Sequence, residues 1–228
     1  LDDLSDAKSQ GNGHNLYLGQ NAGANSPLNK GNVGVGFEVL QANTDGASNA
    51  SIGHQSLRAN TSGFGNSALG FKSLYFNTTG IGNTANGFGS LYSNTTGFGN
   101  TAGGYQTLFY NTTAENNTAS GFQAQHRNET GNNNTSIGFQ ALHRNIKGNE
   151  NTAIGYKADV TSDSLSNATA IGANTKVSQS NSLILGNNVN VGLGTSMPET
   201  SAMLDIQSDK KGILIPRMTA VQKTSIVN

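Results

Sequence analysis

A glycine returns at a fixed interval of 17 residues along most of this chain, and no other feature of the sequence constrains the fold as strongly. The interval holds nine times without an insertion or a deletion. An Asn precedes each glycine by four residues, except that Ala168 precedes the last. Such regularity indicates stacked repeats, each adding one layer to an elongated fold. The repeat glycines are Gly19, Gly36, Gly53, Gly70, Gly87, Gly104, Gly121, Gly138, Gly155 and Gly172.

Other residue types recur in the same register. A Leu follows many of the glycines by four residues, and a second Asn column comes three residues later. Seventeen residues are too few for two helices and a turn, so we expect each repeat to form one solenoid coil of two short strands and two turns. A ring directly follows most of the glycines, at Phe37, His54, Phe71, Phe88, Tyr105, Phe122, Phe139 and Tyr156.

Alternation within the repeat predicts how each coil packs. In the segment 152–156, Ile154 and Tyr156 share one face of a predicted strand, and Ala153 and Gly155 share the other. We expect the bulky face to fill the coil and the small face to let another backbone approach. Stacked Asn side chains should satisfy one another's amides along the axis. The predicted fold is therefore all-β, a parallel β-solenoid (β-roll) of 17-residue coils.

The composition supports a thin core and excludes several classes of partner. Only 34% of the residues are hydrophobic and 11% are charged, while Gly alone accounts for 30 residues. The net charge is zero, which argues against nucleic acid as a partner. The chain has no Cys, and it has no apolar run approaching the roughly 20 residues that span a bilayer, so we predict no direct membrane insertion.

The register changes after Gly172. Residues 182–186 predict one more strand 14 residues on, and residues 189–194 predict another. We therefore expect an N-terminal connector at 1–14, the solenoid at 15–186, and a neck or connector at 187–228 that leads to a missing C-terminal region. A first residue other than Met and an abrupt end suggest a piece of a longer protein.

Two segments resemble known families. The motifs at 51–53, 136–138, 152–155 and 170–172 resemble the S-x-A-I-G repeats of YadA-like heads in trimeric autotransporter adhesins. This resemblance implies a left-handed β-roll with three chains to a rod. Residues 191–219 look like a segment of tail-fibre-like proteins of phages, contractile injection systems and bacterial cell surfaces. Together they imply an extracellular homotrimer whose chains are intertwined or lie side by side, on a bacterial cell surface or on the tail of a virion or injection system.

The sequence gives no support for an enzyme. Acidic residues are few and scattered, and the Gly-x-Gly segments belong to the repeat and do not open a helix. His126 and His143 should stack on neighbouring coils, but the Arg that follows each one disfavours a bound cation. We predict no catalytic activity, no cofactor and no metal site.

Rings and cations recur five and six residues after the repeat glycine, in two columns that stacking alone does not explain. Rings bury a large area at small entropic cost, so such surfaces often hold sugars or protein receptors. Two interpretations stay open: a seam between the chains of a trimer, or a surface for a host cell-surface glycan or protein receptor. This stripe comprises Arg58, Tyr75, Tyr92, Phe109, Tyr110, His126, Arg127, His143 and Arg144.

Three functional hypotheses follow. The first is a non-enzymatic structural and adhesive module of an extracellular trimeric fibre, head or shaft, that mediates attachment to a host cell or surface. The second is a purely structural spacer of a phage or injection-system tail fibre. The third is ice binding by regular hydroxyls, although the residues that motivate it are expected in a turn. They are Thr61, Thr78, Thr95 and Thr112.

Overall fold

The computed structural model describes residues 7–9, 15–27, 30–215, 217–219 and 222–223. Most of the predicted connector at 1–14 therefore lies outside the described residues, as do the last residues of the predicted neck. The chain divides into two compact units, Leu1–Asn187 and Asn188–Asn228, which are described separately.

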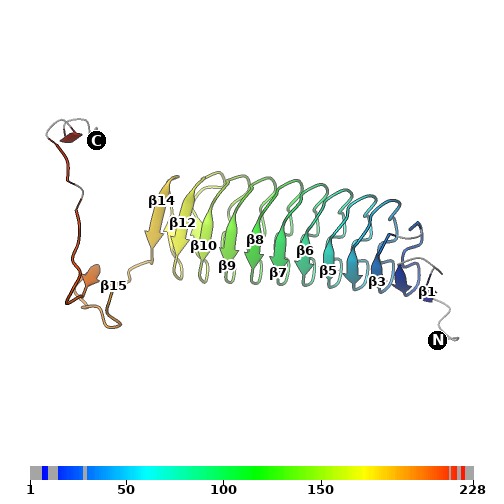
Figure 1. Cartoon of the computed structure of the whole chain (residues 1–228), viewed down its shortest axis with the longest axis horizontal. Helices are drawn as coiled ribbons and strands as arrows, with labels where there is room; N and C mark the ends of the chain where they lie inside the picture. Colours follow the sequence, from blue (N-terminus) through cyan, green and yellow to red (C-terminus); the bar gives the residue numbers. More distant parts are fainter. Residues whose placement is uncertain (1–6, 10–14, 28–29, 216, 220–221, 224–228) are drawn as a thin grey trace. The chain divides into compact units, whose positions relative to one another are not determined.

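The first unit is a parallel β-solenoid in which each coil adds one short strand to a single sheet (Figure 1). The 12-stranded sheet keeps the sequence order; β1 is antiparallel to β2, and every later pair is parallel. The predicted fold class is confirmed. The strands are β1 (Ala7–Ser9), β2 (Leu16–Leu18), β3 (Val33–Val35), β4 (Ala50–Ile52), β5 (Ser67–Leu69), β6 (Thr84–Asn86), β7 (Thr101–Gly103), β8 (Thr118–Ser120), β9 (Thr135–Ile137), β10 (Thr152–Ile154), β12 (Ala168–Ile171) and β14 (Ser182–Leu185).

Most coils have one strand, so the expectation of two strands in every coil is wrong. A second strand occurs only towards the C-terminal end of the solenoid, where β11 (Asp159–Val160) pairs in parallel with β13 (Lys176–Val177). The shortened last repeat is confirmed, because Ala168 of β12 pairs with Ser182 of β14. Elsewhere the chain returns from one strand to the next through turns.

The core lies beneath the small residues of each strand, which reverses the predicted packing. Ala153 is buried, whereas Ile154 and Tyr156 are 38% and 50% exposed. From β4 to β10 the interior of the coil is occupied instead by the return segment, mostly by its Leu, and the strand position that faces inward is Ala or Ser. In β2 the inward residue is the fully buried Tyr17. The fully buried leucines are Leu40, Leu57, Leu74, Leu91, Leu108 and Leu142.

This Leu column depends on an unusual backbone. Lys72 and Leu74 have φ angles of 52° and 50°, a left-handed conformation that costs a non-glycine residue about 1–2 kcal/mol. Hydrogen bonds between coils offset that cost. The Leu74 N–H donates to the Ser90 carbonyl of the next coil at 3.0 Å, and the Lys72 N–H donates to the His54 carbonyl of the preceding coil at 2.9 Å. The turns therefore continue the bonding of the sheet.

The repeat glycines sit where two coils approach most closely. Gly70 has a φ of 134°, and a Cβ there would lie 2.5 Å from the Gly87 carbonyl oxygen in the next coil. Gly104 meets Gly121 in the same way, at 2.6 Å. A side chain of any size would push the coils apart. This close contact explains why the glycine interval tolerates no exception.

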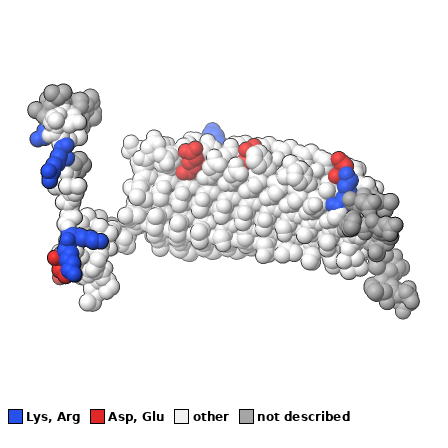
Figure 2. All heavy atoms as spheres, viewed as in Figure 1, with Lys and Arg blue, Asp and Glu red and all other residues white. Residues whose placement is uncertain are grey.

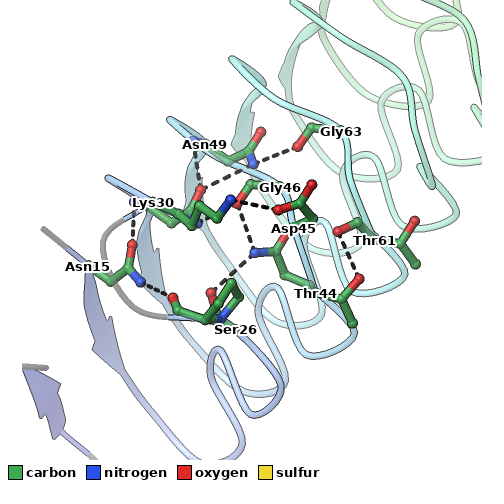
Figure 3. Close-up of polar contacts among 12 residues, drawn as sticks. Asn15, Ser26, Lys30, Thr44, Asp45, Gly46, Asn49, Thr61 and Gly63 are labelled. Carbon is green, nitrogen blue, oxygen red and sulfur yellow. Dashed lines mark hydrogen bonds and ion pairs between the residues drawn. The ribbon is translucent and has the colours of Figure 1, made fainter. Parts of the chain in front are cut away.

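A buried Asn column forms the first of two hydrogen-bonded ladders, as predicted. The backbone N–H of Asn49 and its Nδ2 donate to Asn32 Oδ1 at 3.0 and 3.2 Å. Asn49 Nδ2 also donates to the Gly63 carbonyl at 2.9 Å (Figure 3). The bonds satisfy amides that would otherwise be buried without partners. The column contains Asn15, Asn32, Asn49, Asn66, Asn83, Asn100, Asn117, Asn134 and Asn151.

The second Asn ladder lies beside the first, because Asn83 Nδ2 and Asn94 Nδ2 donate to the same Gly97 carbonyl. Asn94 Nδ2 donates to Asn77 Oδ1 at 2.8 Å and to the Gly97 carbonyl in its own turn at 3.0 Å. Each amide thus fixes a turn and joins two coils. The column contains Asn43, Asn60, Asn77, Asn94, Asn111, Asn128 and Asn145.

One polar break interrupts the core. Gln125 occupies a position of the Leu column and is fully buried, yet neither its Nε2 nor its Oε1 has a hydrogen-bond partner among the described residues. Ser136, in the strand column, has an equally buried Oγ that likewise lacks a partner in the described part of the chain. The hydrophobic core is divided here, because one cluster ends at Ala124 and the next begins at Ala141.

The second unit has little core of its own. β15 (Val191–Leu193) pairs in parallel with β16 (Leu204–Ile206) in a two-stranded sheet. No side chain among its described residues is buried, and Met197 and Leu214 are 82% and 81% exposed. Among the residues described in either unit, none belongs to a helix with the length and apolar character that crossing a membrane requires.

Candidate functional site

The stripe lies on the return segment of each coil, directly after the left-handed Leu. Because this segment is a turn and not a strand, the two columns do not point to opposite sides as alternation would require. Tyr75 and Tyr92 are half-buried, while Tyr110, Arg127 and Arg144 of the adjacent column are exposed. Both columns therefore reach the surface.

The first column is a continuous stack of rings, which we call the stripe ladder. Its members are Tyr75, Tyr92, Phe109, His126 and His143, with successive centroids 5.3, 4.8, 5.4 and 5.6 Å apart and planes within 25° of parallel. The predicted stacking of the two histidines is confirmed. Since each inner ring has both faces covered by its neighbours, the ladder presents ring edges to the outside.

Rings of the second column pack against the side of this stack. Tyr110 meets Phe109 and His126 edge-on, at centroid distances of 5.0 and 5.2 Å and interplanar angles of 79° and 77°. Phe76 repeats this arrangement nearer the N-terminus. These edge contacts hold the stripe ladder in one conformation and leave Tyr110 at the surface.

Arg58 closes the N-terminal end of the stripe ladder. Its Cζ lies 5.7 Å from the Tyr75 centroid, and Nη1 donates to the Tyr75 hydroxyl at 3.2 Å. Its Nε donates to Glu38 Oε2 at 2.8 Å, and hydrogen bonds from Gln55 and Arg58 lower the pKa of Glu38. Arg58 is therefore tied to the solenoid itself.

The C-terminal end of the stripe ladder is basic. Burial is the main cause of the lowered pKa of His126, whose Nδ1 lies 2.9 Å from the Gln106 carbonyl. No three potential metal-binding side chains gather anywhere in the described part of the chain. Neither Arg127 nor Arg144 forms an ion pair with a described residue. These two guanidinium groups are available to a partner.

A second stack of rings, the outer ring ladder, runs beside the stripe ladder. It joins the eight rings from Phe37 to Tyr156 that directly follow the repeat glycines, with centroids 4.9–5.4 Å apart. The expected column of Phe71, Phe88 and Phe122 is thereby confirmed, and Phe139 belongs to it as well.

A column of Gln and Lys side chains stands two residues after most of the repeat glycines, although Glu38 and Gly89 occupy that position in two coils. Lys72 Nζ is 5.3 Å from the ring centroids of both Phe71 and Tyr75, so the ladders are neighbours at this coil. Elsewhere Gln side chains stack, as in the bond from Gln123 Nε2 to Gln106 Oε1 at 3.1 Å. Sequence reasoning did not single out this Gln and Lys column, although it follows the same 17-residue interval.

The Thr hydroxyls that motivated the ice-binding hypothesis already donate hydrogen bonds within the solenoid. Thr78 Oγ1 donates to the Thr95 carbonyl at 3.0 Å, and Thr61 and Thr95 make the equivalent bonds. A different Thr column lies on the outer face of the sheet, with Thr84, Thr101 and Thr118 exposed.

Figure 2 shows only a few charged side chains on the visible face of the solenoid unit. The Lys30–Asp45 ion pair, 2.6 Å long, is near the N-terminal end (Figure 3). The surface is therefore governed mainly by rings, amides and hydroxyls.

Comparison with known proteins gives a match in the second unit of the chain. Residues 192–228 match the model of a family described as a phage tail like trimerisation region. No curated protein and no solved structure gives a significant match to the chain. The match supports the resemblance of the tail to tail-fibre-like proteins and a homotrimeric assembly. It does not extend to the solenoid, and it says nothing specific about the YadA-like repeats.

The chemistry of the trimerisation region agrees with assembly between chains. Ile213, Leu214 and Ile215 are exposed in succession, and Met197 and Met203 are exposed as well. A segment this apolar gains stability by burying its side chains against sister chains, because it buries almost none of them within one chain.

Proposed function

We propose that this chain is a structural and adhesive module of an extracellular trimeric fibre without catalytic activity. Its fibre belongs to the tail of a virion or injection system, or to a bacterial surface. The trimerisation region joins three chains, and the solenoid forms the body of the module. The match of residues 192–228 carries the structural half of this proposal.

The adhesive part of the proposal rests on the stripe. A rigid ridge of ring edges, Tyr hydroxyls and exposed Arg side chains offers apolar area and hydrogen-bond donors together. Its rings are already fixed by stacking and by the edge contacts of Phe76 and Tyr110, so little conformational entropy is lost when a partner binds. A host cell-surface glycan or protein receptor fits this chemistry.

The test compares two Tyr residues, one from each of the two ring ladders. Tyr92→Ala removes a ring of the stripe ladder, and Tyr105→Ala is the matched control in the outer ring ladder. Each full-length variant is examined for mass by light scattering and for attachment to a panel of cells and immobilised glycans. We expect Tyr92→Ala to stay trimeric and to lose attachment, while Tyr105→Ala keeps both.

The other outcomes identify the competing functions. A Tyr92→Ala protein that falls to monomer mass would show that the stripe is a seam between chains. Unchanged mass and unchanged attachment would mean that the protein attaches through another surface. An unaltered protein that attaches to no cell and no glycan would favour a purely structural spacer. Each of these results removes the stripe from the adhesive surface.

Ice binding is a second candidate because of the exposed Thr column on the outer face of the sheet. Thr84, Thr101 and Thr118 repeat at the spacing of neighbouring strands, about 4.8 Å, on the outer face of β6, β7 and β8. Thermal hysteresis of the purified protein tests this idea. A freezing point equal to the melting point excludes it.

A further inference from the structure

The solenoid surface is hollowed at the C-terminal end of the stripe ladder. The hollow has a volume of about 200 Å³ and is lined by Gln140, His143, Arg144, Lys157, Asp159 and Lys176. Three cationic side chains converge there in a chain with only 13 Lys and Arg residues in total. Sequence reasoning found His143 and Arg144 but not the two lysines, which lie outside the stripe columns.

The one carboxylate of the hollow is turned inward and already satisfied. Asp159 Oδ1 accepts the backbone N–H groups of Arg144 and Val160 at 3.2 and 3.0 Å, and its side chain is 4% exposed. Lys176 Nζ lies 3.5 Å from Asp159 Oδ2 and donates to the Lys157 carbonyl at 3.0 Å. Asp159 and Lys176 therefore balance each other.

Two cations remain without a carboxylate among the described residues. The Arg144 side chain is exposed and forms no ion pair there. The Lys157 ammonium lies 5.2 and 5.9 Å from the ring centroids of Tyr156 and Phe139, at the end of the outer ring ladder. An anion in the hollow would thus meet Arg144 and Lys157, with exposed rings beside it.

We propose that this hollow binds the carboxylate of an acidic saccharide. An Arg guanidinium holds a carboxylate through two parallel hydrogen bonds, and the adjacent rings can contact the nonpolar face of a sugar. The hollow is smaller than the roughly 300 Å³ at which pockets for whole drug-sized ligands begin, so it suits one charged residue of a longer glycan. This inference rests on the proposed attachment function and names its ligand class.

The experiment uses the full-length protein and two acidic probes, 3′-sialyllactose and trigalacturonic acid, with lactose as the neutral probe. Calorimetry at low salt should show at least one acidic probe binding about ten-fold more tightly than lactose. Arg144→Gln should remove most of that preference. Lys147→Gln is the control, because it removes one positive charge from an exposed side chain that belongs to neither the hollow nor the stripe, and it should leave the preference within about two-fold.

Three results would overturn the proposal: no preference for either acid over lactose, an equal loss in Lys147→Gln and Arg144→Gln, or a fall of Arg144→Gln to monomer mass. Lys157→Gln, also expected to reduce the preference, replaces Arg144→Gln if that variant does not fold. If attachment depends on Tyr92 but neither acid is preferred, the acid-binding hollow is refuted and the proposed attachment function stands. If an acid is preferred but the protein attaches to no cell, the attachment function is refuted and the hollow stands.

Discussion

At the scale of single residues, each column of the repeat has one steric or hydrogen-bonding task. Gly70 admits the next coil, Leu74 fills the interior from a left-handed backbone, and Asn77 fixes a turn. Because these tasks recur in every coil, an exception in one column is informative. Gln125 is such an exception.

We expect Gly70→Ala to lower the free energy of unfolding by at least about 2 kcal/mol, because the new Cβ meets a backbone carbonyl and the φ angle is strained. Gly65→Ala is the control. Gly65 has a φ of 66°, but a methyl group added there would find no atom within 4 Å, so the loss should be about 1 kcal/mol. Urea unfolding followed by circular dichroism measures both. Equal losses would contradict the proposed close contact.

Gln125→Leu should raise the free energy of unfolding by about 1–3 kcal/mol, since it removes a buried amide that lacks hydrogen-bond partners among the described residues and completes the Leu column. Leu91→Gln, the reverse change elsewhere in that column, should lower it. The same urea titration reports on both variants. A destabilised Gln125→Leu protein would mean that the amide has a partner in solution.

The sequence predicted the columns but not which of them faces inward. Alternation separates Ala153 from Ile154, yet it is silent on which side is covered. The covering residue is the Leu of the return segment, and its burial depends on positive φ angles that no residue preference would suggest. Similarly, the stripe was identified from its spacing, whereas only the folded structure shows that Lys157 and Lys176 line a hollow with His143 and Arg144.

At the scale of elements, the ladders make each coil depend on its two neighbours. Asn amides join the coils inside, and stacked rings join them outside. His126 is part of both the stripe ladder and a contact with the Gln106 carbonyl, so its ionisation bears on local stability.

Burial lowers the pKa of His126 in the folded state below its unfolded value of about 6.5. The neutral ring is therefore favoured by folding, and its stabilising contribution is present above the unfolded pKa and lost as pH falls through the folded pKa. We expect His126→Phe to keep the stack and to reduce the loss of thermal stability between pH 7 and pH 5. Parallel melting-temperature profiles for the two proteins would contradict this.

At the scale of the whole molecule, the two units differ in how much of their apolar surface is buried within one chain. The solenoid unit buries its Leu and Ala columns within one chain, whereas the trimerisation region leaves its apolar side chains exposed. We therefore expect the first to be stabilised mainly by contacts between its coils, and the second to be stabilised by other copies of the chain.

Leu214 is 81% exposed in the single chain, and we expect the trimer to bury it between chains. Leu214→Asp should then convert the trimer to monomer, because burying a carboxylate costs several kcal/mol in each subunit. The far-ultraviolet circular dichroism of the solenoid should not change. Lys210→Asp is the control for added negative charge and should remain trimeric. Light scattering gives the masses, and a trimeric Leu214→Asp protein would place the subunit contact elsewhere.

The constant glycine interval has a consequence for how such a molecule can vary. The regular 17-residue coils join one another through the same hydrogen bonds, so an in-frame gain or loss of 17 residues in that part of the solenoid should leave the remaining junctions intact. Duplication or deletion within the gene can therefore alter the reach of the module in increments of about 4.8 Å without any redesign of its interior.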